Sequence, residues 1–143
     1  MDAKQYLRQL NTLQRRVDYD IMQAEKLDSQ TRRITQVLSS NRSGGTGSND
    51  KMGDSIAALM DWKAKLEDDA AEMTAMLLEA KDLLNKIRKP AYKELLFRRY
   101  IVGDTFEDIA ESWGQTPRNV YYTHGKALQV FRKLMEEDSE KSE

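Results

Sequence analysis

Side chains that can contact nucleic acid gather in one stretch near the end of the chain. Residues Thr116 to Met135 include four basic residues and no acidic one, although the chain of 143 residues has a net charge of -1. Arginine can bond to guanine, asparagine and glutamine to adenine, and lysine to phosphate. The candidate DNA-contact residues in this stretch are Thr116, Arg118, Asn119, Tyr121, Tyr122, Lys126 and Gln129. We therefore predict that this stretch binds double-stranded DNA.

The same stretch is predicted to be a helix with one inner and one outer face. A rotation of about 100° per residue places Val120, Ala127 and Phe131 together on the inner face. The outer face then holds Arg118, Tyr122, Gly125 and Gln129, flanked by Asn119 and Lys126. Because glycine has no side chain, Gly125 would allow DNA to approach the helix closely. The N-terminus of this helix, at Thr116, would also favour a phosphate.

Two further arginines lie upstream of this helix. Arg98 and Arg99 are candidates for contacts with backbone phosphates, but ordinary solvated charges would look the same in the sequence. His124 falls close to the inner face of the predicted helix. We therefore expect a packed or boundary histidine at that position.

The composition gives no support to an enzyme. The chain has no cysteine and one histidine, so thiolate sites and histidine-rich metal sites are excluded. No nucleophile with a plausible base, and no paired general acid and base, can be identified. We predict no catalytic residue, no metal ion and no cofactor.

Three short helices are predicted to position the candidate DNA-contact residues. They span 91–102, 105–113 and 116–135, with Gly103 ending the first and Gly114 the second. Thr105 and Thr116 are suitable N-caps, and Pro117 suits the first helical position. Ala110, Gly114 and Val120 have the spacing of a helix-turn-helix, in which a small residue, a tight turn and an apolar anchor follow one another. The expected core of this module is Phe106, Ile109, Trp113, Ala127, Leu128 and Phe131.

The first part of the chain predicts two long helices. Residues 2–38 and 51–88 carry apolar side chains at alternating spacings of three and four, which is typical of helices that pack along a seam. Asp20 and Thr31 interrupt the first seam, and Ile21 is expected to replace Asp20 in it. The segment 39–50, SSNRSGGTGSND, predicts a flexible loop. We therefore expect an antiparallel, coiled-coil-like hairpin.

Together these patterns predict an all-α protein with three parts. The helical hairpin occupies residues 1–89, the helix-turn-helix module 90–135, and a disordered acidic tail 136–143. No apolar stretch approaches the roughly 18 residues that cross a membrane. The polar N-terminus also lacks the apolar segment of a signal peptide. A cytoplasmic protein without a membrane partner is expected.

The C-terminal module resembles region four of bacterial sigma factors. The matching residues in 95–128 are Leu96, Tyr100, Gly103, Ile109, Ala110, Gly114, Val120, Ala127 and Leu128. The chain as a whole, including DKMGDSIAAL at the start of the second long helix, resembles phage-encoded late-gene activators of the RinA/ArpU type. The resemblance implies promoter binding beside RNA polymerase in a bacterial host cell, with Thr116, Arg118, Asn119, Tyr122 and Lys126 at the recognition positions. No segment resembles the sigma part that melts DNA, so an accessory activator is implied.

Other functions remain compatible with the sequence. The chain could be a DNA-packaging subunit of the small-terminase kind, with the hairpin driving a ring. It could also be an interaction module that binds RNA polymerase without DNA. The hairpin itself could be a spacer, a partner-binding surface or the interface of a homodimer.

Overall fold

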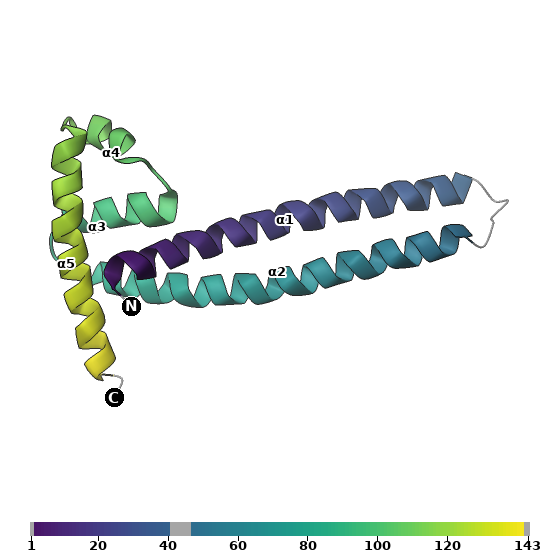
Figure 1. Ribbon diagram of the computed structural model, residues 1–143, viewed down its shortest axis with the longest axis horizontal. Helices are drawn as coiled ribbons and strands as arrows, with labels where there is room; N and C mark the ends of the chain where they lie inside the picture. Colours follow the sequence, from purple (N-terminus) through teal and green to yellow (C-terminus); the bar gives the residue numbers. More distant parts are fainter. Residues whose placement is uncertain (1, 41–46, 142–143) are drawn as a thin grey trace. The chain divides into compact units, whose positions relative to one another are not determined.

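The computed structural model describes residues 2–40 and 47–141, and every regular element in that part of the chain is a helix (Figure 1). The expected all-α class is therefore confirmed. In chain order the helices are α1 (Ala3–Ser40), α2 (Gly47–Asn85), α3 (Pro90–Leu96), the π-helix η1 (Phe97–Val102), α4 (Phe106–Trp113) and α5 (Pro117–Lys141). Within the described ranges, no helix is long and apolar enough to cross a membrane.

Contacts between residues divide the chain into two compact units. Unit 1 comprises Met1–Leu13 and Thr74–Glu143, and unit 2 comprises Gln14–Met73. The division therefore falls inside the two long helices, whereas the sequence suggested a boundary between residues 89 and 90. The first turns of α1 and the last turns of α2 belong with the short helices because their apolar side chains share one core with them.

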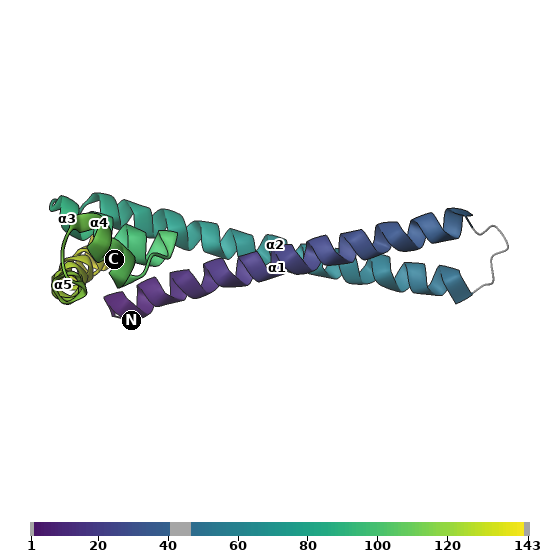
Figure 2. The ribbon, with the colours of Figure 1, turned by 90° about the horizontal axis from the view of Figure 1, so that it is seen from above.

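Unit 2 contains the remaining parts of α1 and α2, which lie side by side and run in opposite directions (Figure 1) and cross one another when seen from above (Figure 2). The rings of Tyr19 and Trp62 meet edge to face with centroids 6.0 Å apart, and Val17 and Leu59 are buried. Ile21 does not replace Asp20 in the seam as expected, because Asp20 is fully buried and Ile21 is 38% exposed. Asp20 follows Val17 by three residues, so the helical period carries its side chain into the seam.

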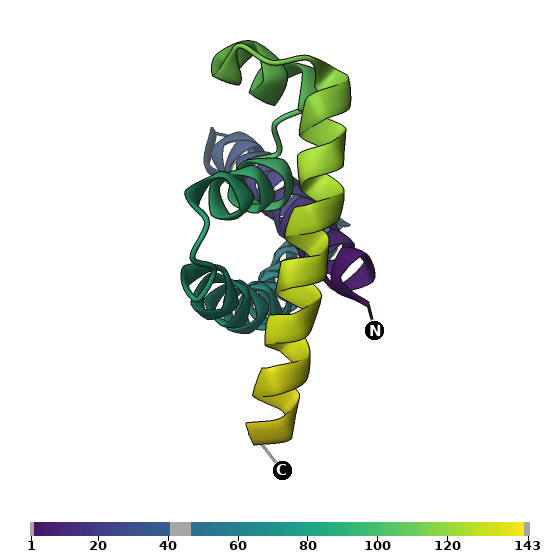
Figure 3. The same cartoon turned by 90° about the vertical axis from the view of Figure 1, so that its left-hand side faces the viewer.

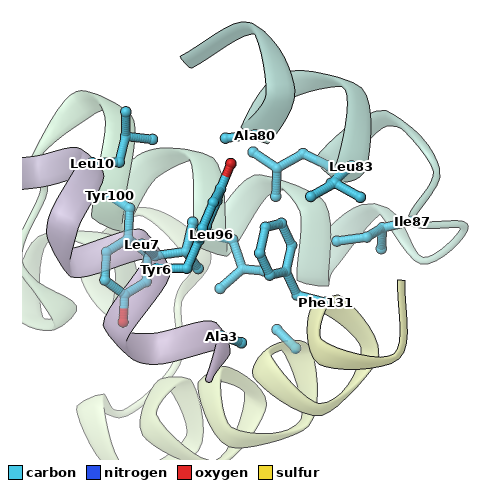
Figure 4. Packing of buried hydrophobic residues seen from close by; sticks show 12 residues of the cluster. Ala3, Tyr6, Leu7, Leu10, Ala80, Leu83, Ile87, Leu96, Tyr100 and Phe131 are labelled. Carbon is cyan, nitrogen blue, oxygen red and sulfur yellow. The ribbon is translucent and has the colours of Figure 1, made fainter. Parts of the chain in front are cut away.

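Unit 1 is built around α5, which contacts both α3 and α4 (Figure 3). Its main core contains Phe131 of α5, which packs with Leu96 of α3 and with side chains of the first turns of α1 and the last turns of α2 (Figure 4). Tyr6 of α1 lies 5.8 Å from Phe131 between ring centroids, and its hydroxyl donates to the Met76 carbonyl at 3.4 Å. A second core cluster joins Leu95, Ile109, Ala110 and Val120.

The stretch expected as one helix over 91–102 changes its hydrogen bonding at Phe97. After α3, the residues of η1 follow the wider π pattern, and the Gly103 N–H donates to the Arg98 carbonyl at 2.9 Å. Gly103 ends η1 with a φ of 96°, a left-handed conformation that glycine adopts without steric cost. The expected helix end at Gly103 is confirmed, and the π turn was not predicted.

Several other helix ends differ from the predicted ones. The second long helix ends at Asn85 rather than at Arg88, since the N–H groups of the next two residues donate to the carbonyls three residues back, at 3.2 and 3.0 Å, and so leave the α pattern. Lys89 is extended before Pro90, with a ψ of 115°. Residues 39–40 and 47–50, predicted as parts of a loop, are helical, since helix propagation tolerates the polar residues at helix ends. The other predicted loop residues, 41–46, lie outside the described part.

The acidic segment predicted to be disordered is helical as far as Lys141. Glutamate is a good helix former, and Glu136 pairs with Arg132 one turn earlier at 3.2 Å. Asp138 also lies 3.7 Å from the Lys86 ammonium. The prediction was therefore wrong for residues 136–141, and residues 142–143 lie outside the described part.

Candidate nucleic-acid interface

Local hydrogen bonds set the turn between α4 and α5. Thr105 caps α4 by accepting from the Asp108 N–H at 3.1 Å. Gly114 ends α4 with a φ of 65°, and the Gln115 N–H donates to the Ala110 carbonyl at 2.9 Å. Thr116 then caps α5 by accepting from the Asn119 N–H at 3.2 Å. These caps confirm the predicted starts of both helices, and each cap of this kind is worth about 1 kcal/mol.

The inner and outer faces of α5 lie as the sequence predicted. Val120, Ala127 and Phe131 are fully buried. The side chains expected to contact DNA from this helix are all exposed: Thr116, Arg118, Asn119, Tyr121, Tyr122, Lys126 and Gln129. No acidic side chain of the described residues forms an ion pair with Arg118 or Lys126. The outer face of α5 therefore presents two free cations together with amide and phenol groups.

Tyr121 and Tyr122 project from neighbouring positions of α5 but differ in their contacts. Tyr121 is 63% exposed, and its ring meets Phe106 of α4 edge to face at 6.0 Å. Tyr122 is 61% exposed, and no aromatic partner is found for it in the described residues. Tyr122 is thus the freer of the two phenols.

Gly125 lies in the middle of α5 on the exposed face. A Cβ atom built at Gly125 would meet no other atom within 4 Å, so packing inside the protein does not require a glycine. Glycine in a helix interior costs about 1 kcal/mol relative to alanine. The residue therefore lowers helix stability without an intramolecular reason.

Arg98 and Arg99 are placed differently from the other candidates. The Arg98 guanidinium binds Asp104 at 2.8 Å, lies 3.8 Å from Glu94 and donates to the Ser112 hydroxyl at 3.0 Å. Arg99 donates to the Asp104 carbonyl at 3.2 Å, and its guanidinium lies 4.8 Å from the centroid of the Phe106 ring. Both arginines therefore connect η1 with the loop before α4 and with α4 itself, a role that their sequence position does not reveal.

His124 is buried between η1, α4 and α5, as expected for a packed histidine. Its Nε2 lies 2.7 Å from the Tyr100 hydroxyl, and the Phe106 ring meets it edge to face at 4.9 Å. Burial, and to a smaller extent the nearby cations of Lys4, Arg99 and Arg8, lower the pKa of His124 to about 4. The imidazole is therefore neutral at pH 7 and belongs to the packing of the module.

Two of the basic residues that lower the pKa of His124 lie at the start of the chain and were not predicted to lie near α5. Lys4 and Arg8 are exposed residues one turn apart on α1, and both lie near enough to His124 to lower its pKa. Figure 3 shows the first turns of α1 beside the middle of α5. Their spacing of four residues puts them on one helix face, but no local pattern could show that this face borders α5.

Acidic side chains limit where a phosphate chain could lie. Glu107 and Glu111 are exposed on α4, whereas the exposed charges of α5 from Arg118 to Lys133 are basic. Because like charges repel, a phosphate chain would be repelled by the exposed face of α4 and attracted by this part of α5 and by the first turns of α1. In the described part of the chain, no group of three or more acidic, histidine or cysteine side chains is placed to hold a metal ion.

Comparison with known proteins found no matching family model, no matching curated protein and no matching solved structure.

Proposed function

We propose that this protein is a sequence-specific DNA-binding transcriptional regulator in which α4, the turn at Gly114 and α5 form a helix-turn-helix. In this proposal α5 is the reading helix, and α1 and α2 form the helical hairpin that precedes the module. The resemblance to region four of sigma factors and to late-gene activators of phages favours action at a promoter together with RNA polymerase.

The observation that carries the proposal is the division of α5 into two faces. Its inner face is fixed in the core by Val120, Ala127 and Phe131. Its outer face exposes the free side chains of Arg118 and Lys126 around Gly125, where the backbone can be approached closely. A reading helix requires this combination of a rigid inner face and a polar, basic and accessible outer face.

The proposed mechanism separates positioning from reading. Lys126, Lys4 and Arg8 would contact phosphates and set the position of the protein on the duplex, which carries no sequence information by itself. Arg118, at the start of α5, would bond to guanine, and Asn119 would bond to adenine. The N-terminal N–H groups of α5 would add a phosphate contact.

The proposal is tested by fluorescence anisotropy with promoter-containing and random-sequence duplexes at several salt concentrations. We expect preference for one duplex and an affinity that falls steeply as salt rises, because bound phosphates release counterions. Absence of binding at low salt would contradict the proposal, and RNA polymerase would then be tested as the direct partner. An assembly of eight or more chains in solution would favour the packaging function instead.

Arg118→Ala tests the reading role of α5. If Arg118 makes a bidentate base contact, the variant should lose about 1–3 kcal/mol of specific binding and part of its sequence preference. Arg15→Ala is the matched control, since Arg15 is an exposed arginine of unit 2. Equal affinity and equal preference in Arg118→Ala and the unaltered protein would contradict the assignment of α5 as the reading helix.

A further inference from the structure

A pocket of about 410 Å³ opens between the last turns of α2 and the helix α3, entirely within unit 1. Leu84, Pro90 and Phe97 supply its apolar surface, and Lys81, Lys93 and Glu94 supply charged groups. It exists because α2 ends at Asn85 and the chain turns before Pro90, so that the two helices meet at a corner. Its volume is within the range of known ligand pockets.

The apolar surface of the pocket is accessible to a partner. Phe97 is 39% exposed, although a phenylalanine gains about 1.5–3 kcal/mol when it becomes fully buried. Phe97 is also the first residue of η1, and π turns inside helices are frequent at functional sites. A bulky apolar side chain from another molecule would cover Phe97.

The charges around the pocket are unequal. Glu94 is the one carboxylate that lines the pocket, against two lysines, and it shares the Arg98 guanidinium, 3.8 Å away, with Asp104. Lys81 and Lys93 have no ion pair with any described residue, and neither has an acidic residue three or four positions away in its helix. The uncompensated charge at the pocket is therefore positive.

We propose that this pocket binds a protein segment that carries a bulky apolar side chain flanked by carboxylates, such as one face of an acidic amphipathic helix. The apolar side chain would pack on Leu84 and Phe97, and the carboxylates would pair with Lys81 and Lys93. Grooves that take an amphipathic helix combine these features. An acidic segment complements the charge, and the apolar floor argues against nucleic acid as the occupant.

This segment and DNA would bind on different sides of the module. Leu95 and Phe97 are two residues apart, so they point to nearly opposite sides of the helix. Leu95 packs with Ile109, Ala110 and Val120 of α4 and α5, whereas Phe97 lines the pocket. The proposal does not depend on DNA binding and adds a protein partner to the proposed regulator.

The probe is a phage-displayed library of short random peptides, selected on the full-length protein. We expect enriched peptides that combine leucine, phenylalanine or tryptophan with aspartate or glutamate. Anisotropy with the synthetic peptides should show about tenfold weaker binding to Phe97→Ala, and a similar loss in the double variant Lys81→Glu, Lys93→Glu. Leu78→Ala and Lys133→Glu, which change exposed residues that do not line the pocket, should bind normally.

Several results would overturn the proposal. The selection could enrich no peptide, or it could enrich basic peptides. The selected peptides could also bind Phe97→Ala as tightly as they bind the unaltered protein. Thermal unfolding followed by circular dichroism checks that each variant is folded, and the charge-reversal variant provides a test that leaves the apolar surface intact. A concentration-dependent dimer abolished by Phe97→Ala would assign the pocket to a second copy of the chain instead.

Discussion

Gly125 is the residue of α5 whose identity the packing of the protein does not explain. We expect Gly125→Ala to raise the free energy of unfolding by about 1 kcal/mol, because alanine favours helix and no atom lies within 4 Å of the new Cβ. The same variant should lose about 1–3 kcal/mol of DNA-binding free energy if the DNA backbone approaches this point, since the added methyl group would then clash with the DNA. Thermal unfolding and anisotropy measure the two effects.

Gly53→Ala is the matched control for Gly125→Ala. Gly53 is an exposed helical glycine of α2, and a Cβ there also meets nothing within 4 Å. This variant should gain stability and keep its DNA affinity. If Gly125→Ala behaves in the same way, the close approach of DNA at Gly125 is refuted.

His124 makes the stability of the protein depend on pH. Its pKa is lowered from 6.5 to about 4 in the folded protein, so the unfolded chain binds more protons between these values. The contribution of His124 to stability is therefore complete above pH 6.5 and decreases as the pH falls towards 4. Because the chain has one histidine, NMR of its imidazole should show a titration midpoint near pH 4 in the folded protein.

His124→Gln isolates this contribution in unfolding experiments. Glutamine does not titrate, so between pH 6.5 and pH 4 the variant should lose less stability than the unaltered protein. Subtracting the two curves of stability against pH removes the contribution of the carboxylates, which both proteins share. A titration midpoint of the His124 imidazole near pH 6.5 would refute the neutral, buried imidazole. Parallel curves of stability against pH for the two proteins would refute it as well.

Among the elements, the seam between α1 and α2 in unit 2 contains an unfavourable polar pair. Three carboxylate oxygens are buried without a hydrogen-bond donor among the described protein atoms: both oxygens of Asp20 and Oδ2 of Asp69. The other oxygen of Asp69 lies 4.0 Å from the Arg16 guanidinium. A hydrogen bond between the two carboxyls requires a proton on one of them. That bond, the burial of Asp20 and the charge of Asp69 raise the pKa of Asp20, against the opposing effects of Lys65 and Arg16.

Asp20→Asn should stabilise unit 2 at neutral pH. A carboxyl with a raised pKa in the folded state stabilises most at low pH, and this contribution is lost as the pH rises through the folded pKa. Asparagine stays neutral and can donate to Asp69, so we expect a gain of about 1–3 kcal/mol at pH 7. Circular dichroism during heating should show a higher unfolding midpoint at pH 7 and a smaller difference at pH 4. An unchanged or lower midpoint at pH 7 would contradict this account.

In the complete fold, the first turns of α1 and the helix α5 contribute to one folded unit. Leu7 and Leu10 of α1 are fully buried in the core that also holds Phe131 of α5. Leu7→Ala should therefore lose about 2–5 kcal/mol of stability, as large-to-small changes in cores do. Leu78→Ala should change stability by less than about 0.5 kcal/mol, because Leu78 is 59% exposed. Denaturant unfolding of both variants measures the difference, and equal stability would refute the shared core.

The features that depend on neighbouring residues were predictable from the sequence. The starts of α4 and α5, the turn at Gly114 and the two faces of α5 were all predicted, because capping, left-handed backbone and helical period act over a few residues. Helix ends were predicted less well. The early end of α2 at Asn85 and the extension of α5 to Lys141 depend on small differences in free energy between helix and coil.

The contacts between residues far apart in the sequence were not predictable and are known from the folded chain. The fold placed Lys4 and Arg8 near α5, tied Arg98 to Asp104 and Ser112, and buried Asp20 beside Asp69. It also assigned the first turns of α1 to the unit that contains α5. None of these contacts leaves a local pattern in the chain, because each arises when apolar surfaces far apart in the sequence are buried together.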